Sequence, residues 1–177
     1  MGLEFNSRVP AGESETTPVE GGKYTAEQRD LVNREIERLR GADETALFAL
    51  NEDSVSRRVD WYRQNCSGFP FLSDDPLESA YRLLLERFQI SPEEAPVVSR
   101  TEHSITFHSQ NFCPTLEACR ILGLDTRHVC KRINEDSTNV LLRQIDPRLR
   151  FSRNYEKLRP YAPYCEETIS LETESSR

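Results

Sequence analysis

The chain has 177 residues, of which 30% are charged and 36% are hydrophobic, and its formal net charge at pH 7 is -7. A length of this order corresponds to a single domain. The acidic balance argues against a nucleic-acid-binding surface, and no apolar run approaches the roughly 18 residues of a membrane-spanning helix. We therefore expect a cytoplasmic protein that binds neither nucleic acid nor membrane. Whether it forms a homo-oligomer is left open.

The two ends of the chain are predicted to be disordered tails. Residues 1–23 are polar and rich in Gly, Pro, Ser and Glu, and residues 173–177 are equally polar. Neither stretch buries enough apolar surface to offset the entropy of ordering. Between them, residues 24–172 are predicted to form one α+β domain. It has a helical part over 24–96 and a strand-helix-helix-strand-strand part over 97–172.

Helices in the first part are predicted from apolar residues at helical spacing and from capping signals. They are 25–40, 43–50, a segment from Asp53 or Ser54 to Cys66, and a segment that begins at Asp75-Pro76. The first has a clear start, because Thr25 and Gln28 form a capping box before the apolar stripe. The last is favoured by Pro76, since proline suits the first helical position.

Beyond Val97 the apolar period changes from 3.6 to 2, which predicts β-structure. Residues 97–110 are expected to form one long strand or a hairpin bent near Thr101. The elements expected after it are helices 114–122 and 125–144, the second interrupted near 134–137, and strands 148–155 and 164–171. The predicted fold is therefore a set of N-terminal helices followed by an antiparallel sheet that is packed by two helices.

The cysteines carry the main chemical signal. Five cysteines without framework spacing predict free thiols in a reducing compartment. Cys113 is expected at the N-cap of the helix that starts at Pro114, where unpaired N–H groups and the helix dipole favour the thiolate. It is the candidate nucleophile, with a small buried hydrophobic residue as the alternative. Cys130 is expected to be buried beside Ile133.

A metal site is another interpretation of the same residues. A zinc ion would need three or four converging ligands. The candidates are Cys113, Cys130, Cys165 and either His108 or His128. No pair of them has the close spacing that is typical of a zinc site in a sequence. No metal or other cofactor is therefore favoured, and zinc is kept as the alternative.

The order of motifs over about residues 100–170 resembles the L-2-amino-thiazoline-4-carboxylic acid hydrolase-like family. The shared features are Phe112-Cys113-Pro114 after a strand, a helix that ends at Leu122-Gly123, Cys130 followed by Glu135 or Asp136, an arginine-containing extended segment over 147–153, and Cys165-Glu166. A looser similarity links the chain to vinyl-reductase-type small-molecule-binding domains. Two features depart from the family pattern. The acidic residue lies further from Cys130, and the segment 159–162 replaces the usual turn.

The resemblance implies a hydrolase that opens a small cyclic amidine or thiazoline carboxylate. A cysteine would be the nucleophile, a histidine the acid–base group, and an arginine would hold the substrate carboxylate through paired N–H donors. The candidates are Cys113, His108 and His128 for catalysis, and Cys130, Arg150, Arg153 and Cys165 for substrate binding. The alternative is a non-catalytic module that binds or senses a small molecule in the same pocket.

Overall fold

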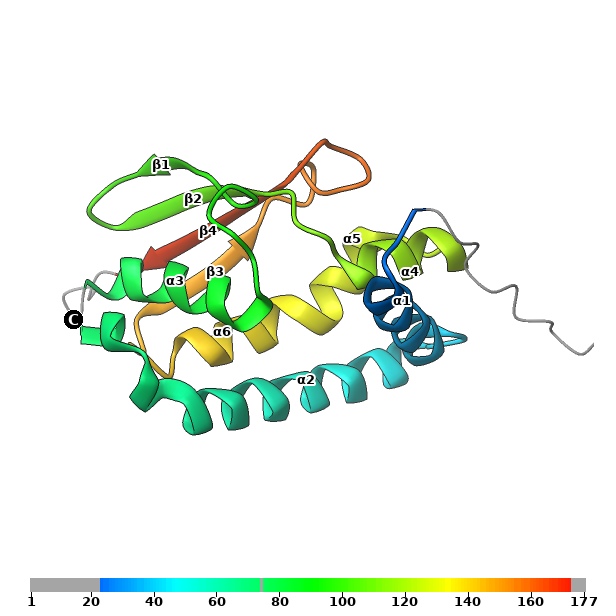
Figure 1. Cartoon of the computed structure of the whole chain (residues 1–177), viewed down its shortest axis with the longest axis horizontal. Helices are drawn as coiled ribbons and strands as arrows, with labels where there is room; N and C mark the ends of the chain where they lie inside the picture. Colours follow the sequence, from blue (N-terminus) through cyan, green and yellow to red (C-terminus); the bar gives the residue numbers. More distant parts are fainter. Residues whose placement is uncertain (1–22, 74, 173–177) are drawn as a thin grey trace, which may run out of the picture.

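Antiparallel strands form a sheet with the order β1-β2-β4-β3 in the structure, a computed structural model that describes residues 23–73 and 75–172 (Figure 1). The strands are β1 (Val97–Arg100), β2 (Ser104–Ser109), β3 (Leu149–Arg153) and β4 (Cys165–Leu171). Together with the helices they confirm the predicted α+β class. The two predicted tails, 1–23 and 173–177, lie outside the described residues apart from Lys23.

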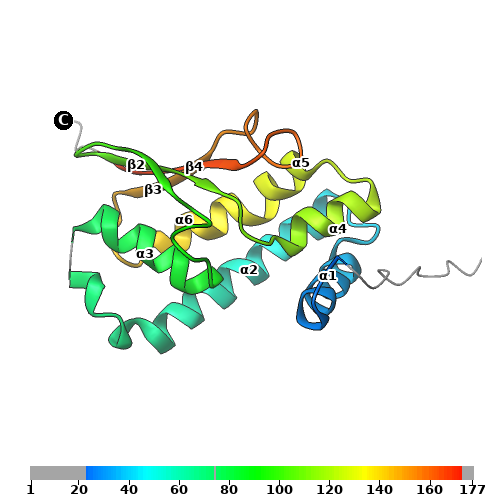
Figure 2. The ribbon, with the colours of Figure 1, turned by 45° about the horizontal axis from the view of Figure 1, so that its top comes forward.

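Helices cover one face of this sheet and extend beyond it. They are α1 (Ala26–Leu39), α2 (Glu44–Asn65), the short 3-10 helices η1 (Cys66–Gly68) and η2 (Pro70–Ser73), α3 (Pro76–Phe88), α4 (Pro114–Leu122), α5 (Thr126–Cys130), the π-helix η3 (Lys131–Glu135) and α6 (Asp136–Leu142). Helices α3 and α6 contact the sheet, and α2 packs against α6 on the side away from the strands (Figures 1 and 2). Helices α1 and α4 lie together at one end of the molecule.

The main core forms where the sheet meets α3 and α6. Alternate residues of the strands point inward, as the period-two pattern predicts, so Ile105 and Phe107 of β2 are buried while Thr106 between them faces the other side. Buried leucines such as Leu84 of α3 and Leu141 of α6 fill the same core. A second apolar cluster joins α1, α4 and α5, so the α1–α4 end has a core of its own.

Local signals located several elements correctly. Thr25 and Gln28 form the predicted capping box at α1, and Asp75 caps α3 directly before Pro76. The strand region after Val97 is the predicted hairpin, because the chain turns between β1 and β2 at residues 101–103. The sequence also predicts an irregularity near 134–137 in the helix after Asp125. The structure has one slightly earlier, the π-helix η3 at residues 131–135, and the chain stays helical through the expected break.

Two features differ from the expectations. The predicted break between residues 50 and 53 is wrong, because α2 runs without interruption from residue 44 to 65. No glycine or proline lies in that span to end it, and Asp53 pairs with Arg57 one turn further on, at 2.9 Å, instead of capping a new helix. The two helices expected on the sheet are both from 114–144. Instead α6, from that segment, and α3, from the N-terminal part, pack on the sheet, while α4 packs on α1.

In the described part of the chain, no helix is long and apolar enough to cross a membrane.

Candidate functional site

A cavity of about 720 Å³, which we call the main cavity, lies between the sheet and the helices α1 to α4. Its apolar wall includes Trp61, Leu84, Phe107 and Phe151. Its polar wall contains arginines, thiols and carboxylates. They are Arg58, Arg87, Arg153, Arg159, Cys113, Cys130, Cys165, Glu86, Glu94 and Glu167. A space of this size and mixed character is typical of a small-molecule site.

Four of the residues singled out in the sequence line this cavity. Cys113 is the N-cap of α4, Cys130 is the last residue of α5, Arg153 ends β3, and Cys165 begins β4. Each of them therefore lies at the end of an element, and the packing of α4 and α5 near the end of the sheet brings those ends to one wall.

The other candidate residues point elsewhere. His108 lies on the outer face of β2, where its ring stacks on Tyr164 with the centroids 3.7 Å apart and its Nε2 lies 3.3 Å from Glu166 Oε2. His128 is exposed, and its Nε2 lies 2.6 Å from a carboxylate oxygen of Glu44. Arg150 donates two hydrogen bonds, of 2.6 and 2.5 Å, to the surface carboxylate of Glu172. Among the described residues, the cavity wall contains no histidine.

Burial sets the protonation of two of the cavity thiols, Cys113 and Cys130. The Leu116 N–H donates to Cys113 Sγ at 3.4 Å, as the N-cap position predicts, and Arg159 also favours the thiolate. Burial nevertheless outweighs these contributions and raises the pKa of Cys113 above its ordinary value. Burial also raises the pKa of Cys130, to about 12. Both groups are therefore neutral thiols at pH 7.

The zinc alternative requires three or four ligands around one point. Over residues 23–73 and 75–172, no group of three or more His, Cys, Asp and Glu side chains is placed to hold a metal ion. The three cavity thiols share their wall with Arg153, whose positive charge lies close to Cys130 and disfavours a second cation there. This set of donors therefore does not fit a metal ion.

An ion pair fixes one end of the cavity. Arg153 Nε donates to Glu167 Oε1 at 2.6 Å, and Ser109 Oγ donates to the other carboxylate oxygen at 2.8 Å. Burial is the largest single effect and disfavours the charged guanidinium, but the charge and the hydrogen bond of Glu167, together with smaller contributions from neighbouring groups, outweigh it and raise the pKa of Arg153. Arg153 Nη1 is buried and has no hydrogen-bond partner. One donor of this charged group therefore has no hydrogen-bond partner within the described protein, and the residue that carries it lines the cavity.

A second buried guanidinium, that of Arg58, was not predicted from the sequence. It is 7% exposed and donates to Asn134 O at 3.1 Å, Thr138 Oγ1 at 2.7 Å and Asn134 Oδ1 at 2.8 Å. No carboxylate among the described residues pairs with it, and burial together with nearby Arg153 and Arg87 lowers its pKa to about 9. The available signal was its position, because it lies on the buried stripe of α2 with Asn51 and Ser54.

The π-helix η3 supplies the acceptors for Arg58. Asn134 lies within it, and both its backbone carbonyl and its side-chain oxygen face the guanidinium. Single turns of π-helix occur frequently at functional sites because they redirect backbone groups out of the regular α-helical pattern. Here the irregular turn holds a buried cation next to the cavity without neutralising it.

Unsatisfied donors concentrate around this region. In the described ranges, the buried side-chain nitrogen and oxygen atoms without a hydrogen-bond partner are Arg38 Nη2, Asn51 Oδ1, Arg87 Nε, Arg153 Nη1 and Arg159 Nε. All but one belong to arginines that line the main cavity or the space beside it. Buried polar groups are normally paired, so this concentration identifies a place suited to an anion.

Fold and cavity together define an α+β protein with an arginine-rich, thiol-lined pocket. No protein-family model matches the chain, and comparisons with curated proteins and with solved structures also gave no match.

Proposed function

We propose that the protein is a non-catalytic module that binds or senses a small organic anion in the main cavity. The observation that carries this proposal is the surplus of buried guanidinium donors over acceptors. Arg58 has no carboxylate partner, and Arg153 and Arg159 each have an unpartnered buried nitrogen. An anion would accept these hydrogen bonds, and charge-assisted bonds are the stronger class. The apolar wall would contact the body of the ligand.

Two observations favour binding over catalysis. Burial keeps the Cys113 thiol neutral, and a thiol is a weaker nucleophile than a thiolate. The histidines proposed as acid–base groups, His108 and His128, point to the outer surface rather than to the cavity. A general acid or base has to reach the reacting atoms directly or through one water.

The test compares three probes with similar aromatic bodies and different charge: benzoate, phenyl phosphate and the cationic benzylamine. Thermal unfolding is followed at constant ionic strength over a concentration series of each probe. At least one of the two anions should raise the melting temperature in a saturable way, because a ligand that binds only the folded state stabilises it. Benzylamine should give no saturable shift. Two outcomes contradict the proposal: a saturable shift with benzylamine alone, and the absence of a saturable shift with any of the three probes.

Matched variants locate the binding. The double variant Arg153→Gln/Glu167→Gln replaces the ion pair by a neutral pair of similar shape, so it removes the charge without leaving an isolated carboxylate. The rise in melting temperature that benzoate causes should be smaller in this variant. Arg150→Gln removes an arginine from the same strand, but from a surface pair outside the cavity. The Arg150→Gln variant should bind benzoate like the unchanged protein. An equal loss of benzoate binding in both variants would indicate that the anion binds non-specifically to positive charge.

The hydrolase is the second candidate function. Cys113 lines the cavity at the N-terminus of α4 with Arg153 and Arg159 close by, so a nucleophile and a cation for a carboxylate share one wall. The direct test is incubation with L-2-amino-thiazoline-4-carboxylate, followed by mass spectrometry for a product that is heavier by one water. Turnover that disappears in Cys113→Ala would support the hydrolase. Binding without turnover would leave the binding module as the function.

A further inference from the structure

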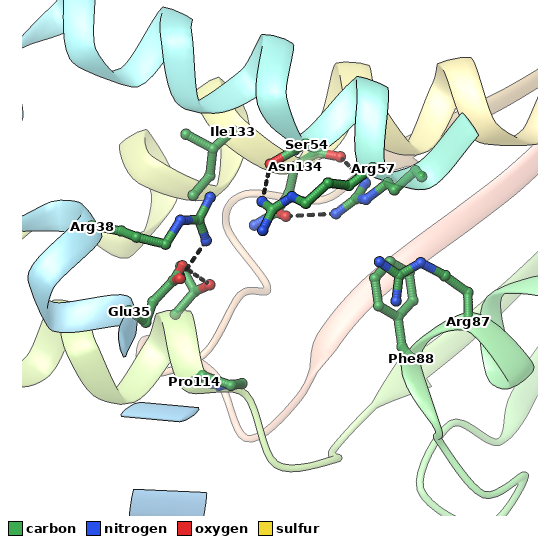
Figure 3. A pocket seen from close by; sticks show the side chains of 11 residues that line it. Glu35, Arg38, Ser54, Arg57, Arg87, Phe88, Pro114, Ile133 and Asn134 are labelled. Carbon is green, nitrogen blue, oxygen red and sulfur yellow. Dashed lines mark hydrogen bonds and ion pairs between the residues drawn. The ribbon is translucent and has the colours of Figure 1, made fainter. Parts of the chain in front are cut away.

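A smaller cavity of about 290 Å³ lies beside the main cavity, and we call it the arginine chamber. The two spaces share wall residues, including Arg58, Arg87 and Asn134, so they adjoin. In Figure 3, Arg38 and Arg87 lie on opposite sides of the chamber, and Asn134 lies along one edge between them. The chamber is therefore a side compartment whose wall is formed by charged side chains from α1, α2 and α3.

Positive charge is in excess here. Four arginines, namely Arg38, Arg57, Arg58 and Arg87, line the chamber with a single acidic residue, Glu35. Glu35 is already engaged, because Thr115 Oγ1 donates to one of its oxygens at 2.7 Å and Arg38 Nη1 lies 2.5 Å from the other. Arg58 and Arg87 have no carboxylate partner among the described residues.

The chamber also holds free donors. Arg38 Nη2 and Arg87 Nε are buried without a hydrogen-bond partner. The Arg87 guanidinium is positioned by aromatic rings instead, with its carbon 5.3 Å from the centre of the Trp61 ring and 5.6 Å from that of Phe88. Such stacking holds a guanidinium in place and leaves its N–H groups available.

One helix adds to the positive field. Pro114 and Thr115, the first residues of α4, line the chamber. Pro114 has no N–H, and the Leu116 N–H already donates to Cys113 Sγ, so the contribution of this helix is mainly its dipole. The N-terminus of a helix carries partial positive charge, which favours an anion. Arg38 pairs with Glu35 and Arg57 with Asp53. The chamber thus combines two guanidinium groups that have no carboxylate partner among the described residues, those of Arg58 and Arg87, with the positive end of a helix.

We propose that the arginine chamber is a phosphate subsite, and that the ligand is a phosphate monoester whose organic part lies in the main cavity. This inference rests on the proposed binding function and specifies its ligand class. A carboxylate brings one negative charge and two oxygens. A phosphate monoester brings about -1.5 to -2 charges at pH 7 and three acceptor oxygens. The second group matches several converging arginines better than the first.

Calorimetric titration of the full chain with phenyl phosphate, inorganic phosphate and benzoate tests the inference. Phenyl phosphate should bind roughly tenfold more tightly than benzoate, which corresponds to one additional charge-assisted contact. Its affinity should rise between pH 5 and pH 7, because the second phosphate ionisation occurs near pH 6. The affinity of benzoate, which is already ionised in this range, should stay constant.

Variants then locate the phosphate group. Arg87 borders both cavities, so the effect of Arg87→Gln is compared with that of Arg153→Gln/Glu167→Gln, whose residues line only the main cavity. Arg87→Gln removes a chamber guanidinium that makes no ion pair, and it should weaken both phosphate probes roughly tenfold while benzoate changes less than about twofold. Arg63→Gln is the matched control, because Arg63 lies on α2 with its side chain 71% exposed and pairs only loosely with Asp60. It should bind all probes like the unchanged protein. Thermal unfolding of each variant verifies that it is folded.

The outcomes distinguish the two proposals. If benzoate and phenyl phosphate bind equally and Arg87→Gln affects neither, the phosphate subsite is refuted while anion binding in the main cavity stands. If phosphate binding depends on Arg153 and Glu167 but not on Arg87, the phosphate lies in the main cavity and the subsite is again refuted. If no probe binds, both proposals fail.

Discussion

Arg153 and Glu167 form an ion pair across β3 and β4 that leaves one nitrogen of the guanidinium without a partner. Arg153 Nε donates to Glu167 Oε1 at 2.6 Å, while Nη1 is buried and unpaired. The two residues are opposite each other in the register of the two strands. The sheet therefore determines the orientation of the guanidinium before any ligand is present, which lowers the entropic cost of binding an anion.

This geometry predicts a large stability effect for Glu167→Gln. Removing one partner of a buried ion pair leaves an uncompensated charge, and the free energy of unfolding should fall by roughly 3–5 kcal/mol. Urea denaturation measures the change. The control is Glu172→Gln, which breaks the exposed pair with Arg150 and should cost less than about 1 kcal/mol. Equal effects in both variants would show that the Arg153 pair is not buried in solution.

Cys130→Ser tests the packing of the cavity wall. The Cys130 side chain is 7% exposed, so a serine there would bury a poorly satisfied hydroxyl. We expect the free energy of unfolding to fall by about 1–3 kcal/mol. Cys66→Ser at the end of α2 provides the comparison, since Cys66 is only partly buried and should change stability little. An unchanged urea midpoint for Cys130→Ser would place this residue on the surface.

Alkylation of Cys113 tests the protonation of the thiol. Because burial raises the pKa of Cys113, its reaction with iodoacetamide in the folded protein should have a pH midpoint above the ordinary value of about 8.5 for a free thiol. Mass spectrometry of the digested protein follows the modification at each pH. Reaction after unfolding in urea is the reference and should show the ordinary midpoint. A folded-state midpoint below about 7.5 would instead support a reactive nucleophile.

Glu166 predicts a specific response to acid. Hydrogen bonds from Asn154, Lys157 and His108 lower its pKa from 4.5 to about 2 in the folded protein. A depressed carboxylate pKa contributes stability that is fully present above pH 4.5 and is lost as the pH falls through about 2. Glu166→Gln should therefore lower the melting temperature at pH 7, and the difference from the unchanged protein should disappear near pH 2. A difference that is constant with pH would contradict the assignment.

Much of the fold follows from local patterns in the sequence. The capping box at Thr25, the Asp75-Pro76 start and the N-cap at Cys113 all depend on contacts within one turn of helix, so short-range chemistry is sufficient to locate them. The change of period after Val97 located the hairpin, because alternation is a property of a single strand. Local reasoning failed within α2, where the acidic residue Asp53 could cap a helix or continue one.

The site depended on tertiary structure. Arg58 lies on a long helix and Arg153 on a strand, and only the packing of α2 on α6 and of α6 on β3 places both guanidinium groups at one cavity. The sequence alone located most of the helices and strands, apart from the continuity of α2, and placed Cys113 at the start of a helix. It did not determine that His108 faces outward or that burial outweighs the helix dipole at Cys113. Those outcomes depend on desolvation by segments distant in the chain, which no local pattern encodes.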